Sequence, residues 1–146
     1  MEVTVRHIEN ADAAAAAQLS AQFGYPVDVP VMRRRIETLD RDRRAVLAAC
    51  VDGQVAGWID VCEVNHLQSG GYAEIGGLVV AEESRSHGIG ARLVKAAENW
   101  ACERGLSRVV VRSQLKREAA HRFYVREGYQ ITKTSVVFTK ELNPRD

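Results

Sequence analysis

The sequence predicts an α/β protein in which helices pack on a mixed β-sheet. Stretches with strand-like alternation are interspersed with stretches of helical periodicity, and glycine or proline separates many of them. The 146 residues can bury one core, and hydrophobic residues make up 46% of the chain, which is typical of a globular domain. Because no repeat, linker or low-complexity segment interrupts the chain, we expect residues 1–146 to form a single domain.

The first third of the chain predicts one strand and two helices. Residues 3–8, VTVRHI, alternate between apolar and polar positions as a strand does. The alanine run at 13–17 favours a helix, which Asn10 or Asp12 can cap. A second helix is expected over residues 28–39, after the helix-breaking sequence FGYP.

A hairpin is predicted in the middle of the chain. Asp52 and Gly53 form a turn signal between two apolar runs, so residues 44–64 favour two antiparallel strands. Residues 66–71, HLQSGG, predict a loop, and residues 72–80 predict the next strand. Its glycine pair, GG, would weaken a regular strand, so it indicates a β-bulge or the close approach of a ligand; tight packing against a helix is the alternative.

The last third alternates between helices and strands. A helix is expected from about residue 88 to 104, a short strand over 107–113 and a second helix over 117–127. Residues 129–142 alternate between polar and apolar side chains, which predicts a final strand. The complete order is β-α-α-β-β-β-α-β-α-β.

Composition and charge argue against several classes of function. A formal net charge of +1 gives no electrostatic reason to expect nucleic acid or membrane binding. No apolar run reaches about 18 residues, and the first ten residues lack the apolar segment of a signal peptide. Three widely spaced cysteines, Cys50, Cys62 and Cys102, suggest reduced thiols in a cytoplasmic protein. The histidines show no metal-ligand spacing with them, so we expect no metal.

The loop at residues 85–90, RSHGIG, indicates a phosphate-binding site between a strand and a helix. An NTPase P-loop requires Lys-Ser/Thr after the last glycine, whereas alanine and arginine follow Gly90. A dinucleotide fingerprint requires a third glycine, and Leu93 occupies that position. The remaining pattern is R-x-x-G-x-G, in which backbone N–H groups and the helix dipole can hold a pyrophosphate beside Arg85.

Two longer segments extend this pattern into a family resemblance. The sequences AEIGGLVV and RSHGIGARLVKAAENWACERG resemble the acetyl-CoA motif of the GCN5-related N-acetyltransferase (GNAT) superfamily. The downstream sequence VVVRSQLKREAAHRFYVREGY resembles the second signature of that superfamily. Among its branches, AEIGGLVV, AHRFY and TSVVFTKEL look most like the bacterial aminoglycoside 6'-N-acetyltransferase-like members.

The resemblance implies a fold, a reaction and a cosubstrate. The fold is a mixed, mostly antiparallel sheet of six to seven strands flanked by about four helices. The reaction is direct transfer of an acetyl group from acetyl-CoA to a primary amine, in a ternary complex, on a small amine or an aminoglycoside-like acceptor. The implied cofactor-binding residues are Leu78, Val79, Val80, Arg85, Ser86, His87, Gly88, Ile89, Gly90, Ala91 and Ser113. Many relatives have an asparagine near Ser113, so this position departs from the family pattern.

Two residues are predicted to act in catalysis. In the family, a tyrosine at the position of Tyr124 lies close to the thioester sulfur, where a phenol that stays protonated at neutral pH can donate to the departing thiolate. Glu74 is the candidate base for the attacking amine, directly or through water, and a structural glutamate paired with an arginine is the equal alternative. His66 is a further candidate base on the loop side.

The acceptor is less specified than the donor. The resemblance places it near residues 23–36 and the loop at 63–72, where acidic and basic side chains are mixed. That mixture does not require a polycation such as an aminoglycoside. The alternatives are a peptide N-terminal acetyltransferase, a non-catalytic CoA-binding module, and a scaffold without CoA binding. Homodimers are common in the family, and the final predicted strand offers a surface for pairing.

Overall fold

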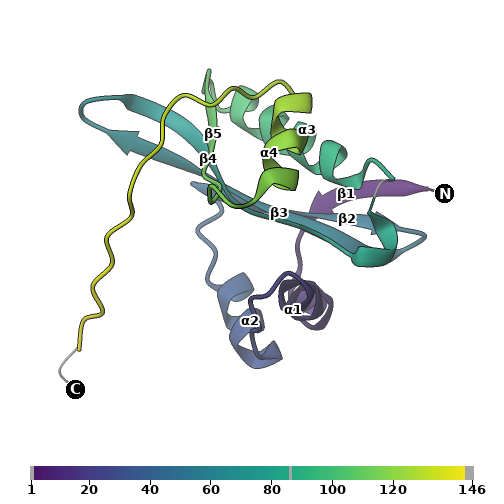
Figure 1. Ribbon diagram of the computed structural model, residues 1–146. Helices are drawn as coiled ribbons and strands as arrows, with labels where there is room; N and C mark the ends of the chain where they lie inside the picture. The colour runs from purple at the N-terminus through teal and green to yellow at the C-terminus, as the bar shows by residue number, and fades with distance from the viewer. Residues whose placement is uncertain (1, 86, 144–146) are drawn as a thin grey trace. The chain divides into compact units, whose positions relative to one another are not determined.

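The computed structural model describes residues 2–85 and 87–143 (Figure 1). The chain divides into two compact units, Met1–Arg112 and Ser113–Asp146, which are described separately. Among the described residues, no helix is long and apolar enough to cross a membrane.

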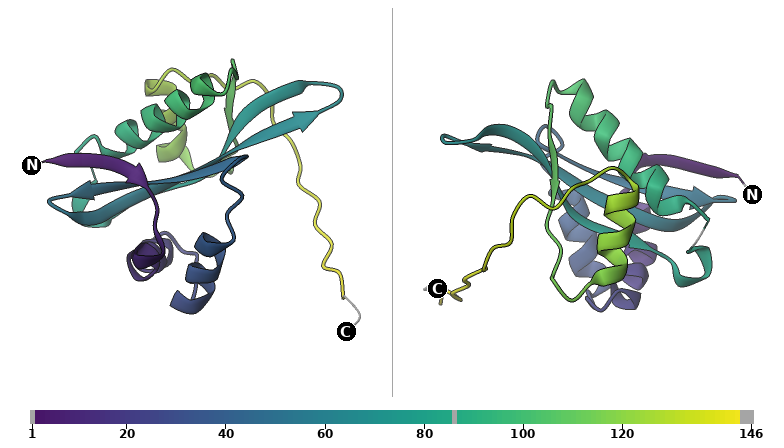
Figure 2. Two further views of the ribbon diagram at one scale, coloured as in Figure 1. Left: turned by 180° about the vertical axis from the view of Figure 1, so that it is seen from behind. Right: turned by 45° about the horizontal axis from the view of Figure 1, so that its top comes forward.

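The first unit contains one five-stranded sheet with helices on both faces (Figures 1 and 2). Its strands follow the order β1-β2-β3-β4-β5, and every neighbouring pair is antiparallel except β4 and β5, which are parallel. The strands are β1 (Val3–His7), β2 (Arg44–Val51), β3 (Gln54–His66), β4 (Gly70–Val80) and β5 (Val109–Val111). The helices are α1 (Ala13–Gln22), α2 (Val29–Glu37) and α3 (Ile89–Glu103), with short 3-10 turns η1 (Asn10–Asp12) and η2 (Glu82–Ser84).

The two faces of the sheet bury different helices. Helix α3 lies on one face, and α1 and α2 lie on the other (Figure 2). The largest fully buried side chains belong to β3 and α3, namely Ile59, Val61, Ile89, Leu93 and Val94. Each fully buried aliphatic side chain contributes roughly 1.5–3 kcal/mol to the free energy of folding, so the α3 face is the main apolar core.

The predicted hairpin turn is confirmed. Strands β2 and β3 pair in antiparallel register up to Val51 and Gln54, and Asp52 and Gly53 connect them. Both connecting residues have positive φ angles, 51° and 84°, as a two-residue type I′ turn requires. The DG sequence is therefore a conformational requirement of this turn.

A one-residue bulge interrupts the pairing of β3 with β4. Asp60 lies opposite Gly77, whereas the next residue, Val61, lies opposite Ile75. Gly76 is the extra residue, so the structure confirms the bulge indicated by the glycine pair. Before the bulge, the even-numbered Glu74 faces the same side of the sheet as Cys62 of β3. After the bulge, the odd-numbered Gly77 and Val79 face that side.

The second unit holds one helix, α4 (Glu118–Arg126), followed by an extended segment. The predicted strand over residues 129–142 is wrong for this structure, because the described part of that segment pairs with no strand. The sheet accordingly has five strands and not the expected six to seven. Alternation indicates that a segment can form a strand, but a strand also needs an edge to pair with. Five large apolar side chains of the segment remain exposed: Ile131, Val136, Val137, Phe138 and Leu142.

An ion pair fixes the entry into α1. Both carboxylate oxygens of Asp12 accept from the Arg6 guanidinium, at 2.8 and 2.9 Å, and one of them also accepts from the backbone N–H of Glu9. The Asp12 side chain is only 9% exposed. It therefore anchors the β1–α1 connection rather than capping α1 as the sequence predicted, since no cap bond from its side chain to α1 forms.

We predict that Asp12→Asn lowers the free energy of unfolding by about 1–2 kcal/mol at pH 7, since the Arg6 partner is partly exposed and its pairing is screened. The hydrogen bond from Arg6 lowers the pKa of Asp12 below its ordinary value of 3.8. The extra stability is therefore present at neutral pH and is lost as the pH falls below about 4 through the folded-state pKa. Urea unfolding at pH 7 and pH 3 measures this difference. The exposed Asp42→Asn is the control, and equal stability of Asp12→Asn and the wild-type protein at pH 7 would contradict the assignment.

Candidate active site

An unpaired strand edge forms the first part of the candidate site. Strands β4 and β5 pair only over residues 73–75 and 109–111. From Gly76 to Val80, the β4 edge that faces away from β3 has no strand partner in the part of the chain that the structure describes. Buried backbone groups need hydrogen-bond partners, so an extended ligand with amide groups can pair here.

The pairing with β3 determines which backbone groups this edge presents. The N–H of Ala81 donates to the carbonyl of Ala56 at 2.8 Å, and hydrogen-bonded pairs alternate along an antiparallel ladder. Val79 therefore bonds to β3, whereas the N–H and C=O groups of Leu78 and Val80 point away from it. Arg85 Nε donates to the carbonyl oxygen of Val80 at 3.4 Å, so the N–H groups of Leu78 and Val80 and the carbonyl of Leu78 remain available to a ligand.

The N-terminus of α3 forms the second part of the site. Gly88 precedes the helix with a φ angle of +76°, a left-handed conformation that strongly favours glycine. No side chain caps the helix, so the N–H groups of its first turn, which includes Gly90 and Ala91, have no intrahelical partner. The Ile89 side chain is only 1% exposed and anchors this turn in the core. The uncapped N–H groups and the helix dipole make this turn suitable for an anion.

The other loop residues predicted to bind the cofactor are Arg85, Ser86 and His87. Arg85 and His87 are exposed, as expected of residues that contact a solvated phosphate group. The predicted contact from Ser86 lies outside the described residues. Their predicted roles in cofactor binding stay predictions.

Two ion pairs lie on the sheet face that carries α1 and α2. Arg44, Cys62 and Glu74 are in register across β2, β3 and β4, so their side chains share one face. Glu74 Oε1 accepts from Arg112 Nε at 3.1 Å, and this carboxylate is the leading cause of the raised pKa of Arg112. Arg44 pairs in the same way with Asp60, one pleat along β3.

Glu74 is paired with an arginine, as expected of a structural glutamate. It is also partly exposed, as a base that acts on a bound amine must be. Between the two ion pairs, burial raises the pKa of the Cys62 thiol. His66 lies four strand positions beyond Cys62, about 13 Å along β3, with its ring 6.0 Å from that of Tyr72. The structure does not bring His66 to Glu74.

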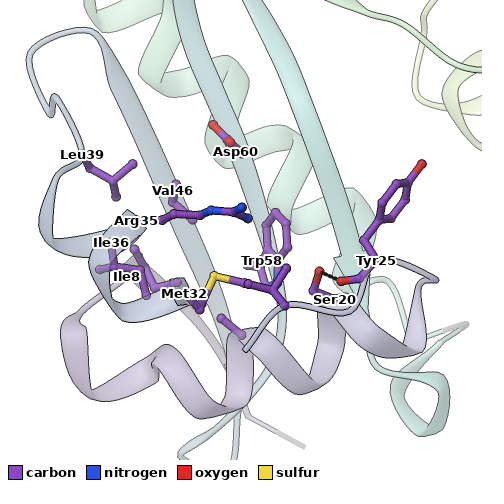
Figure 3. Close-up of a pocket in the computed structure, with 12 residues that line it drawn as sticks. Ile8, Ser20, Tyr25, Met32, Arg35, Ile36, Leu39, Val46, Trp58 and Asp60 are labelled. Atoms are coloured by element: carbon purple, nitrogen blue, oxygen red, sulfur yellow. Dashed lines mark hydrogen bonds between the residues drawn. The ribbon is translucent and has the colours of Figure 1, made fainter. Parts of the chain in front are cut away.

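A cavity of about 210 Å³ lies between the sheet and helices α1 and α2 (Figure 3). Most of its wall is apolar, formed by residues that include Val27, Met32, Ile36, Leu39 and Val46. Trp58 and Asp60 of β3 contribute the sheet side, and Arg35 of α2 extends its guanidinium over the cavity (Figure 3). The sequence predicted this region in outline but missed the roles of Arg35 and Trp58.

The bulge lies against this cavity wall. A Cβ atom at Gly76 would lie 3.7 Å from the carboxylate carbon of Asp60, and one at Gly77 would lie 3.4 Å from the Trp58 ring. Side chains at positions 76 and 77 would therefore cover Asp60 and Trp58, which both line the cavity. The glycine pair keeps the surface of β4 open beside Asp60.

The second unit holds the other predicted residues. Tyr124 is half-buried on α4, edge-on to the rings of Phe123 and Tyr129, at centroid distances of 5.1 and 5.7 Å. Burial raises the pKa of its phenol above the ordinary value of 10, so the hydroxyl stays protonated at neutral pH. Ser113 is exposed at the start of this unit. Because the two units are described separately, the roles of Tyr124 and Ser113 stay predictions.

Comparison with known proteins identifies similar sequences and folds. The profile of the "Acetyltransferase (GNAT) family" matches residues 13–129. An "Aminoglycoside N(6')-acetyltransferase type 1" from Stenotrophomonas maltophilia is 27% identical over 145 residues, which cover 97% of this chain and 95% of that protein. An "Aminoalkylphosphonate N-acetyltransferase" from Salmonella typhimurium is 37% identical over 92 residues, which cover 62% of this chain and 58% of that protein.

A solved structure supports the same fold. AAC(6')-Iy, in complex with the bisubstrate analog CoA-S-monomethyl-acetylneamine, superimposes with a TM-score of 0.85 over 97% of this chain and 100% of that chain. The two sequences are 17% identical, so this likeness concerns the fold alone. Within residues 2–85 and 87–143, no group of three or more His, Cys, Asp or Glu side chains is arranged to hold a metal ion.

Proposed function

The chain belongs to the acetyltransferase (GNAT) family, and from this premise we propose that it moves the acetyl group of acetyl-CoA directly onto a small primary amine. The unpaired edge of β4 beside the uncapped N-terminus of α3 is the observation that carries the proposal. The edge of β4 can pair with the amides of the pantetheine arm of CoA, and the N-terminus of α3 can bind its pyrophosphate. We expect both units to act together as one catalytic domain.

The residues present fit acetyl-CoA. Leu78 and Val80 offer backbone groups along the open edge, and Val79 holds that edge in the sheet through its ladder bonds. The first turn of α3, from Gly88 to Ala91, offers N–H groups to the pyrophosphate, with Arg85 beside it. When bound, acetyl-CoA supplies an acetyl thioester that an amine can attack.

The proposed chemistry divides among three groups. The N–H of Leu78 polarises the thioester carbonyl and stabilises the negative charge that develops on its oxygen. The amine loses a proton to Glu74 or to a water molecule, because a protonated amine has no lone pair with which to attack. The new C–N bond forms as the C–S bond breaks, and Tyr124 donates its proton to the thiolate.

Glu74 acts more readily through water than by direct contact in this proposal. One of its carboxylate oxygens already accepts from Arg112 Nε at 3.1 Å, which leaves the other oxygen to orient a water molecule between Glu74 and the amine. Direct transfer to the amine, without an acetylated cysteine, also agrees with the raised pKa of the nearby Cys62 thiol.

The relatives support an amine acceptor of low molecular weight. One acts by name on aminoglycosides and the other on aminoalkylphosphonates, two small-molecule classes that share a primary amine. Peptide N-termini are the second candidate. The free thiols of Cys50, Cys62 and Cys102 fit the cytoplasmic location that we propose.

We expect the purified protein to release thiol from acetyl-CoA in the presence of at least one primary amine. An assay across small amines, aminoglycosides, aminoalkylphosphonates and peptides measures this release. Acetyl-CoA at 100 times its Kd should also stabilise the protein by about 2.7 kcal/mol in thermal unfolding. Tight binding without turnover on any amine would favour a non-catalytic CoA-binding module, and the absence of saturable binding would favour a scaffold.

Replacing Tyr124 with Phe should lower kcat about 100-fold and leave the Kd for CoA nearly unchanged, because only the proton donor is removed. Tyr129→Phe, which removes a neighbouring hydroxyl, is the matched control. Burial raises the pKa of Tyr124, so any loss of activity from its ionisation should begin only above about pH 10. A wild-type rate for Tyr124→Phe would remove this residue from the mechanism.

We also expect a homodimer, in which the apolar segment that follows α4 adds to a sheet edge of a second copy. β5 is the last strand of the sheet order and pairs only with β4 among the described strands. Light scattering should then give twice the 16.2 kDa mass of one chain. Val137→Pro should yield a monomer because proline blocks strand pairing, whereas Val137→Thr should remain dimeric. A monomeric wild-type protein would refute this arrangement.

A further inference from the structure

We propose that the acceptor is an amino acid-like molecule, in which an apolar body carries the reacting amine and an acidic group, and that Arg35 binds the acidic group. This inference rests on the proposed N-acetyltransferase function and narrows its substrate class. The acidic group is a carboxylate or a phosphonate, since both present paired oxygens to a guanidinium. The acceptor occupies the cavity between α1, α2 and the sheet (Figure 3).

The position of Arg35 on its helix is the first argument. Met32 and Ile36 of α2 line the cavity at helical spacing, Leu39 lines it just beyond the helix end, and Arg35 lies on the same face of the helix. Arg33, Arg34 and Arg35 are all exposed, but of the three only Arg35 lines the cavity. Its guanidinium extends over the cavity (Figure 3), and no carboxylate within the described residues forms an ion pair with it, so it is available to an anionic ligand.

The charge balance of the cavity is the second argument. Its two charged lining residues are Arg35 and Asp60, and Asp60 is already paired with Arg44. The guanidinium of Arg35 is therefore the charge of the cavity wall that no described side chain pairs with. An acidic group on the acceptor would pair with it, whereas a polycationic aminoglycoside would bring further positive charge to it.

A buried donor without an acceptor is the third argument. The indole N–H of Trp58 is buried and has no hydrogen-bond partner among the described residues. A buried donor that stays unsatisfied destabilises the folded protein. Trp58 lines the cavity, and a small rotation of its indole would bring this N–H to an oxygen of an acidic acceptor.

The geometry also gives the acceptor a direction. Arg35 extends from α2, while Asp60 lies at the sheet beside the glycines of the β4 bulge. With its acid at Arg35 and its apolar body along Met32 and Ile36, the acceptor turns its amine toward Asp60 and the open edge of β4.

The test compares amines that differ only in the acidic group. Leucine, its phosphonate analogue 1-amino-3-methylbutylphosphonate and 3-methylbutylamine, which has no acidic group, share one alkyl body. We expect kcat/KM for leucine or its phosphonate analogue to exceed that for 3-methylbutylamine at least tenfold. Kanamycin serves as the polycationic comparison and should be the poorer acceptor. The ratio between the two acids decides between carboxylate and phosphonate.

Variants of Arg35 connect the preference to this residue. Arg35→Gln should lower kcat/KM for the preferred acid about tenfold more than for 3-methylbutylamine, chiefly through KM, and Arg35→Lys should have an intermediate effect. Arg34→Gln, one position away on the exposed side of α2, is the matched control. An unchanged preference in Arg35→Gln, or a wild-type preference for 3-methylbutylamine or kanamycin, would overturn the inference.

Calorimetry separates this inference from the proposed function. If no amine releases thiol, the proposed reaction fails, and binding of leucine and of 1-amino-3-methylbutylphosphonate to the CoA-saturated protein still tests the cavity. Binding of either acid that Arg35→Gln abolishes and Arg34→Gln preserves would support the acidic-acceptor site. The absence of binding by both acids, together with the absence of turnover, would reject it.

Discussion

The candidate active site depends on the single extra residue that Gly76 introduces into β4. Before this bulge, Glu74 shares a sheet face with Cys62; beyond it, Gly77 and Val79 share that face with Asp60 and Trp58. Without the extra residue, Val79, which is 3% exposed, would turn to the opposite face and lose its packing against Leu19. The bulge also coincides with the end of pairing between β4 and β5. One residue therefore sets the free edge of β4 and the open surface beside the cavity.

Much of the fold could be predicted because its signals are local. The DG turn, the glycine at the start of α3 and the glycine pair in β4 each reflect a backbone conformation that few other residues adopt. The segment after α4 could not be predicted in the same way, because strand formation depends on an edge elsewhere that sequence alternation does not specify. Its apolar side chains indicate a need for a partner but do not identify it.

The part of the candidate site that would bind acetyl-CoA could be predicted from the sequence, whereas the part that would bind the amine was less predictable. The glycine loop and the tyrosine after Phe123 belong to continuous motifs, whereas the cavity is assembled from α1, α2, β2 and β3. Arg33, Arg34 and Arg35 are consecutive in the sequence, and only the helical phase of Met32 and Ile36 distinguishes Arg35 from its two neighbours. Trp58 gives no signal beyond its strand parity with Asp60.

The row formed by Arg44, Cys62 and Glu74 has a consequence for self-modification. A protein that handles thioesters exposes its own thiols to acyl exchange, and only the thiolate form attacks efficiently. Partial burial raises the pKa of the Cys62 thiol, which favours its protonated form. Partial burial of this cysteine between two ion pairs thus disfavours its acylation and leaves an amine as the better nucleophile at this place.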